Sequence, residues 1–84
     1  MDEEHLSIQH VLVLRRMEPE RNVARFYVLM IERDLFGRIV LLRRWRRVRS
    51  RGRERVEPYA NQDEAVPAMG KLAAAKRRRG YRDL

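Results

Sequence analysis

Residues 25–48 read RFYVLMIERDLFGRIVLLRRWRRV, two apolar runs joined by a short polar turn. In the first run, residues 25–33, apolar side chains lie at both odd and even positions and so on both faces of a strand, which is typical of a central strand buried on two sides. The turn ends at Gly37, for which we expect a positive φ. In the second run, residues 38–48, alternation places Leu41, Arg43, Trp45 and Arg47 on one face and Leu42, Arg44, Arg46 and Val48 on the other.

The segments on either side extend this hairpin into a sheet. Residues 6–16 are β-branched and aliphatic and predict a strand, followed by turn chemistry at residues 18–22. Residues 49–52 predict a hairpin loop, and residues 53–59 its return strand, stopped by Pro58. Residues 81–84 predict a short last strand or a tied-down end.

One helix follows the strands. Asn61 precedes Glu64 by three positions, a capping signature, and the expected packed face carries Ala65, Val66, Met69, Leu72 and Ala73. Pro67 and Gly70 weaken this helix, so we expect a late start or a slight kink. Cations at residues 76–79 and Gly80 mark its end. The prediction is one α+β domain over residues 1–84, core about 6–83, with an antiparallel sheet of four to six strands and one helix on one face.

Size and composition exclude several classes of protein. The chain has 84 residues and no cysteine, which excludes a multi-domain enzyme, disulfides and thiolate metal sites. His5 and His10 lack a carboxylate cluster at metal-ligand spacing, and no catalytic motif occurs. We therefore expect no enzyme activity, no cofactor and no metal. No targeting or membrane segment is visible, which predicts a cytoplasmic protein.

The positive charge is concentrated in the second half of the chain. Residues 1–37 carry five Arg against seven acidic residues, a balance of −2, whereas residues 38–84 carry fifteen basic against five acidic residues, a balance of +10. Glu54 and Glu57 lie among these arginines and are expected to pair with them. The only tryptophan, Trp45, stands inside the cluster at residues 43–53. An aromatic ring among arginines suits phosphate neutralisation combined with stacking, which favours nucleic-acid binding.

Other interpretations of this cluster stay open. Trp45 can pack into the core while the arginines protect a sheet edge from aggregation. The arginines can also dock an acidic protein or an anionic membrane.

The order of motifs resembles the WGR domain, known from DNA-dependent poly(ADP-ribose) polymerases and from small stand-alone bacterial proteins. The resemblance covers residues 8–83 and is carried by residues 45–48, Gly52, Tyr59, residues 64–65, Lys76 and residues 79–81, with residues 22–27 and 35–37 similar to the bacterial branch. It implies a small antiparallel sheet with one helix and binding to duplex DNA, at ends or nicks. It also implies that Trp45 packs on a sugar near a 5′ terminus, that Arg47 takes the motif arginine role, and that Arg25 helps to hold the terminal phosphate.

Two family glycines are replaced, by Arg46 and Arg49, so the motif is Trp-Arg-Arg-Val-Arg. If those glycines supply a positive φ or a close backbone approach, we expect this chain not to reproduce that geometry, and we expect a shift from ends toward general duplex binding. The expected DNA contacts are Arg25, Arg43, Trp45, Arg46, Arg47, Arg49, Arg51, Arg53, Lys76, Arg77, Arg78 and Arg79. The expected place is the nucleoid, with a DNA-processing protein as a further partner. The alternatives are a protein-interaction module that docks an acidic DNA-processing enzyme, and an RNA-binding basic protein.

Overall fold

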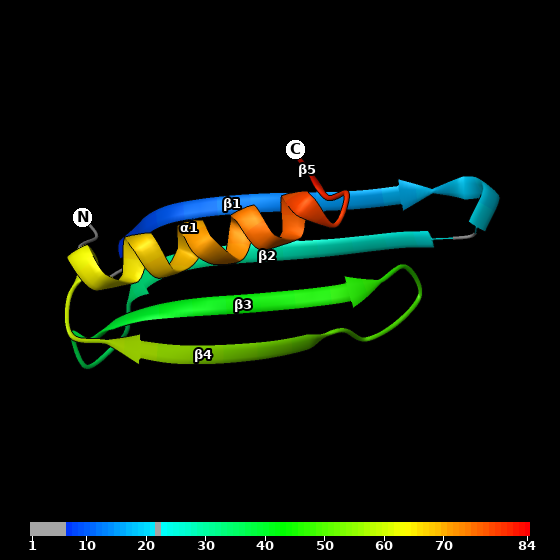
Figure 1. Cartoon of the computed structure of the whole chain (residues 1–84). Coiled ribbons are helices and arrows are strands. Elements are labelled where there is room, and N and C mark those ends of the chain that lie inside the picture. Colours follow the sequence, from blue (N-terminus) through cyan, green and yellow to red (C-terminus); the bar gives the residue numbers. More distant parts are fainter. Residues whose placement is uncertain (1–6, 22) are drawn as a thin grey trace.

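The computed structural model describes residues 7–21 and 23–84 (Figure 1). Its strands are β1 (Ser7–Glu18), β2 (Val23–Arg33), β3 (Ile39–Arg47), β4 (Arg53–Tyr59) and β5 (Arg82–Asp83), with a short 3₁₀ turn η1 (Pro19–Arg21) and one helix, α1 (Gln62–Arg78). This arrangement confirms the predicted α+β class. His5, the expected first strand residue Leu6 and the turn residue Asn22 lie outside the described residues.

The five strands form one antiparallel sheet in the order β4-β3-β2-β1-β5. The first four strands pair with their neighbours along the chain, and β5 pairs with β1 at Leu14↔Asp83 and Arg15↔Arg82. β2 is therefore the central strand, as predicted. Pro58 lies inside β4 rather than ending it, because β4 is an edge strand, where proline is tolerated.

The helix covers only one face of the sheet (Figure 1). Tyr27, Leu29 and Ile31 of β2 are buried in the core cluster with Leu14, Leu41 and the helix residues Ala65, Met69 and Ala73. On the opposite face Phe26, Val28 and Met30 are only partly buried. The expectation that β2 is buried on two sides was wrong, because a single helix supplies only one covering layer.

Both ends of α1 are capped by the residues that predicted them. The Asn61 side chain accepts a hydrogen bond from the Glu64 amide (3.0 Å). At the other end Gly80 has a φ of 97°, and the amides of Gly80 and Tyr81 donate to the carbonyls of Arg77 (3.0 Å) and Lys76 (3.1 Å), which is a Schellman motif. The helix begins at Gln62, so of the two effects expected from Pro67 and Gly70 the late start was wrong, while the slight kink stays a prediction. Val66 is exposed rather than packed, because it lies beside the buried stripe.

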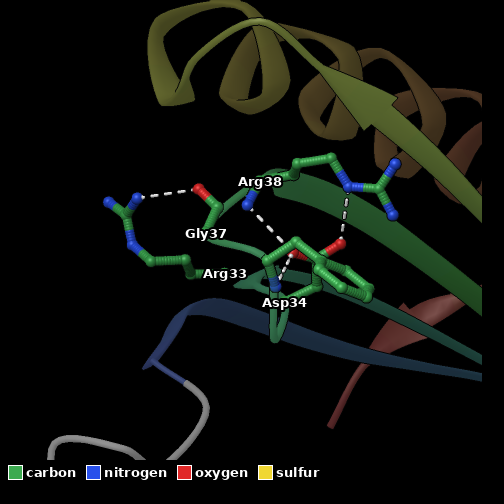
Figure 2. A network of polar contacts seen from close by, with 5 residues as sticks. Arg33, Asp34, Gly37 and Arg38 are labelled. Carbon is green, nitrogen blue, oxygen red and sulfur yellow. Dashed lines mark hydrogen bonds and ion pairs between the residues drawn. The ribbon is translucent and has the colours of Figure 1, made fainter.

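The turn between β2 and β3 is built around the Asp34 carboxylate (Figure 2). Its Oδ1 accepts from the amides of Phe36 and Arg38, each at 2.9 Å, and its Oδ2 accepts from Arg38 Nε at 2.9 Å. Gly37 has the predicted positive φ of 82°, and its carbonyl accepts from Arg33 Nη1 at 3.1 Å. The turn is thus fixed by local hydrogen bonds in which the side chains of Leu35 and Phe36 take no part. The Phe36 ring instead lies under the Arg38 guanidinium, 5.7 Å from the ring centroid.

Candidate nucleic-acid interface

An open cleft lies beyond the C-terminal end of α1, on the face of the sheet that the helix covers. Strands β1 and β2 continue past the helix end, so the last residues of β1 and the first residues of β2 are not covered by the helix (Figure 1). The cleft has a volume of about 510 Å³, and among the described residues that line it eight are cationic and none is acidic. The lining residues are Arg16, Arg25, Phe26, Tyr27, Arg43, Trp45, Arg46, Arg47, Arg55, Lys76, Arg79 and Tyr81.

Strand register explains why three of these arginines meet. Arg16 pairs with Arg25 across β1 and β2, and Arg25 pairs with Arg47 across β2 and β3. Directly opposed residues of antiparallel strands lie on the same face with Cβ atoms about 5 Å apart. The result is a row of three arginines across three strands, of which Arg16 is paired with Glu18. Like charges directly opposite each other destabilise a sheet, and a bound anion would reduce their repulsion.

Stacked aromatic rings form the floor of the cleft. Tyr27 and Trp45 are opposed in the β2–β3 ladder, and their rings stack with centroids 5.7 Å apart and planes 11° apart. Tyr81, placed by the helix cap, meets Tyr27 edge-on at 6.2 Å. Trp45 is partly buried against the core cluster. This agrees with the alternative that Trp45 packs into the core. Because one of its ring faces lies on Tyr27, only its remaining surface is available to a ligand.

Lys76 sits over this floor, with its Nζ 4.3 Å from the Tyr27 ring centroid and 5.6 Å from that of Tyr81. Burial, together with the charges of Arg79, Arg43 and Arg25, holds the pKa of the Lys76 ammonium below its ordinary value. The folded protein therefore holds the Lys76 proton less tightly than the unfolded chain does. A phosphate oxygen in the cleft would offset both causes of this shift.

Few carboxylates neutralise the cleft. Arg16 pairs with Glu18 at 2.8 Å, and Glu57 lies 3.5 Å from Arg43 and 3.4 Å from Arg55. The other five cations, which are Arg25, Arg46, Arg47, Lys76 and Arg79, have no carboxylate within 4.0 Å among residues 7–21 and 23–84. Arg43 adds a buried Nε without a hydrogen-bond acceptor in that part of the chain. The cleft thus carries donors suited to an anion.

The predicted contacts divide into two groups. Arg25, Arg43, Trp45, Arg46, Arg47, Lys76 and Arg79 line the cleft. Arg49, Arg51 and Arg53 lie exposed on the β3–β4 hairpin, outside the cleft lining, and so does Arg78 at the end of the helix. Arg77 is engaged elsewhere, because its Nε and Nη2 donate to the two carboxylate oxygens of Asp83, each at 2.8 Å. These two hydrogen bonds lower the pKa of Asp83 and raise that of Arg77.

Arg46 differs from the other arginines of the motif. It opposes Phe26 in the ladder and has the opposite parity to Trp45 and Arg47, and its guanidinium lies 5.4 Å from the centroid of the Phe26 ring. Its side chain therefore leaves the sheet on the face without the helix, at the rim of the cleft.

Sequence reasoning missed five cleft residues, which are Arg16, Phe26, Tyr27, Arg55 and Tyr81. For Arg16 the alternation along β1 could have revealed it, because Arg16 lies on the same face of the strand as Leu12 and Leu14. Arg55 opposes Arg43 in the β3–β4 ladder, which only the register of that hairpin reveals.

The hairpin after the motif has two residues with left-handed backbone. Arg49 has a φ of 72° and Gly52 a φ of 84°. Arg49 occupies a position where we expected a family glycine, so the expectation that this chain does not reproduce a positive φ there was wrong. A Cβ at Gly52 would lie 2.7 Å from Arg46 Cβ and 2.9 Å from the Trp45 carbonyl oxygen. Gly52 is thus required both for its φ and for its close approach to the motif strand.

Among the described residues, no His, Cys, Asp and Glu side chains gather in a group of three that could hold a metal ion. The described chain also has no helix that is both long and apolar enough to cross a membrane.

Comparison with known proteins gives one family. The model of the WGR domain matches residues 10–84. The uncharacterized protein y4dW of Sinorhizobium fredii is 40% identical over 77 residues, which is 92% of this chain and 38% of that protein. The chain thus spans well under half of the relative's length. No solved structure matches the chain. The matched region includes β1 from His10 onward, the strands β2 to β5 and the helix α1, and the chain belongs to the WGR domain family.

Proposed function

We propose that this protein is a non-enzymatic DNA-binding module, formed by one domain over residues 1–84, that holds the phosphate backbone of a duplex in the cationic cleft. The observation that carries the proposal is the set of eight cations around a floor of stacked aromatic rings, with no acidic side chain among the lining residues that the structure describes. Such a surface gives mainly sequence-independent binding, because phosphates are the same at every base pair.

The proposed roles follow from position in the cleft. Arg16, Arg25 and Arg47 form the row that tracks the backbone, and Lys76 and Arg79 approach it from the helix end. The exposed surface of Trp45 contacts a sugar or base where the duplex has an end or a nick. The hairpin cations Arg49, Arg51 and Arg53 extend the contact along the duplex. We place this activity in the cytoplasm, at the nucleoid.

Salt dependence tests the proposal directly. If about five phosphates are neutralised, log K falls with log salt at a slope of roughly −4 to −5. The assay is fluorescence anisotropy with a blunt duplex with and without a 5′ phosphate, a nicked duplex, an end-free circular competitor, a single strand and an RNA duplex. Intrinsic fluorescence of Trp45, the only tryptophan, gives a label-free second readout. A flat salt response on duplex DNA would contradict the proposal, and tighter binding to RNA would redirect it.

Trp45→Ala separates end recognition from backbone binding. We expect this change to lower the preference for ends and nicks more than the affinity for circular duplex. The matched control is Lys71→Ala, which removes an exposed cation of α1 outside the cleft and leaves both quantities nearly unchanged.

A further inference from the structure

Lys76 supplies the one primary amine among the described residues that line the cleft. Seven of the eight cations there are arginines, and the eighth is Lys76. The two residue types differ in chemistry. A guanidinium stays protonated and holds anions, whereas a deprotonated lysine amine is a nucleophile that forms Schiff bases with carbonyl compounds. The cleft therefore combines several anion-binding groups with one amine that can add to a carbonyl group.

Packing positions this amine over the floor of the cleft. The Nζ atom of Lys76 lies 4.3 Å from the centroid of the Tyr27 ring and 5.6 Å from that of the Tyr81 ring. Tyr81 is itself fixed beside it, because the Tyr81 amide donates to the Lys76 carbonyl at 3.1 Å. No carboxylate of the described residues lies within 4.0 Å of the Lys76 amine. The amine is thus held by aromatic rings and is not occupied by an ion pair in that part of the chain.

The surroundings of Lys76 also favour the uncharged amine that an addition to a carbonyl group needs. Burial lowers the pKa of Lys76, and the charges of Arg79, Arg43 and Arg25 lower it further. The face of the Tyr27 ring attracts a cation and acts in the opposite direction, but it carries no full charge, whereas the arginines carry three. The lowered pKa increases the fraction of Lys76 that is a free amine at neutral pH.

An abasic site in DNA presents a carbonyl group to a protein that holds the backbone. Where a nucleotide has lost its base, the ring-opened sugar carries an aldehyde at C1′, with a phosphate on either side of the sugar. These phosphates are the ligands proposed above for Arg25 and Arg47. We propose, on the basis of the proposed DNA binding, that the cleft captures abasic sites in duplex DNA through a Schiff base between Lys76 Nζ and C1′ of the sugar.

The capture step needs no reagent besides the amine and the aldehyde. The lone pair of Nζ forms the bond to C1′ while the π electrons of the C=O bond move to oxygen, and a proton passes from nitrogen to that oxygen, which gives a carbinolamine. The hydroxyl group then leaves C1′ and the remaining proton leaves nitrogen, together as water, and a C=N double bond remains. Intact nucleotides do not react, because their C1′ bears a base and no carbonyl group.

Borohydride trapping tests the proposal, because borohydride reduces an imine to a stable secondary amine. The full chain is mixed with a duplex that carries one abasic site, at protein concentrations that saturate this duplex in an anisotropy titration. Covalent complexes are then separated under denaturing conditions and digested. We expect the peptide masses to place the sugar on Lys76. The chain has only two lysines, so Lys71 and the N-terminal amine are the only other amines that can react.

Two variants separate capture from binding. Lys76→Arg keeps the positive charge but cannot form the imine, so we expect it to lose the covalent complex. Lys71→Ala removes an exposed lysine of α1 outside the cleft and should capture the abasic site like the unmodified chain.

A duplex with tetrahydrofuran in place of the abasic sugar has no aldehyde and measures binding alone. Binding to this duplex without capture of the abasic site overturns the inference and leaves the proposed function standing. Capture through Lys71 or the N-terminal amine overturns it as well. Absence of binding to the tetrahydrofuran duplex contradicts the proposed function itself.

Discussion

The two ends of this small sheet differ in how far their charged groups are paired: at the β2–β3 turn they are paired within the protein, whereas in the cleft most of the cations are not paired with a described carboxylate. At the β2–β3 turn both oxygens of the Asp34 carboxylate accept hydrogen bonds, from two backbone amides and one guanidinium. At the cleft, three arginines oppose one another in register, a lysine has a lowered pKa, and Arg43 Nε lacks an acceptor among the described residues. The first end is arranged for stability. The second keeps unfavourable features that an anionic ligand would relieve, which is the pattern expected of a binding site.

The largest expected effect removes the cations at the centre of the cleft. Arg25→Ala/Arg47→Ala should weaken duplex binding by about 30- to 100-fold and make the salt slope shallower by about 2, because two phosphate contacts are lost. Anisotropy measures the affinity, and urea unfolding should show unchanged or higher stability, since like charges are removed. The pair Arg33→Ala/Lys71→Ala loses the same charge outside the cleft. If it weakens binding equally, net charge rather than the cleft explains affinity.

Gly52→Ala tests whether the hairpin must approach the motif strand closely. The added Cβ meets Arg46 Cβ and the Trp45 carbonyl on a backbone that disfavours side chains, so we expect a loss of about 2 kcal/mol in the free energy of unfolding. Urea unfolding followed by Trp45 fluorescence checks this value. Gly70→Ala is the control, because a Cβ there has no atom within 4 Å and alanine favours the helix. Equal stability of the two variants would contradict the geometry.

Arg49→Gly should stabilise the fold while weakening DNA binding. Relief of the left-handed backbone is worth about 1 kcal/mol, reduced by the greater freedom of glycine in the unfolded chain. Thermal unfolding and anisotropy give the two readouts. Arg49→Asn removes the charge with a residue that tolerates this backbone. Unchanged DNA affinity in both variants would show that the arginine is not a contact.

Lys76 should make DNA binding sensitive to pH below the range where an ordinary lysine titrates. Its folded pKa is lowered by burial and by neighbouring arginines, so its charge, and with it a phosphate contact, is lost as pH rises through that lowered value. The unfolded chain binds more protons in this window, so the stability of the free protein rises over the same pH range. Affinities measured from neutral to alkaline pH should decline for the unmodified chain and stay level for Lys76→Arg.

The smallest effect is expected at the opposite end. Desolvation raises the pKa of Asp34, but the hydrogen bonds from Arg38 and Phe36 outweigh it and hold the pKa below its ordinary value. The stability contributed by this carboxylate is present above its unfolded pKa and is lost as pH falls through the lowered folded value. Asp34→Asn should therefore lower the urea midpoint at neutral pH, with the difference vanishing in acid. DNA affinity should not change.

Local signals predicted the elements of the fold, whereas the cleft required pairing between distant residues. The Asn61 cap, the positive φ of Gly37 and Gly80, and the alternation of residues 41–47 all follow from a few neighbouring residues. Arg16, Arg25 and Arg47 meet only because of the registers of two strand pairs. Lys76 lines the cleft while its neighbour Arg77 does not, because Arg77 is paired with Asp83. The number of covering layers also needs the whole chain, which is why two-sided burial of β2 was wrongly expected.

The strand order also determines when the binding site comes into existence. Each pairing among β1, β2, β3 and β4 joins consecutive segments, so these hairpins close over short loops. The contacts that bring Lys76, Arg79 and Tyr81 to the sheet join the last residues of the chain to β1 and β2, as Leu14↔Asp83 does. A partly folded chain therefore has cationic strands without a cleft. A ligand that requires Lys76 beside Tyr27 binds the completed fold alone, and shifts the folding equilibrium toward it in proportion to ligand concentration.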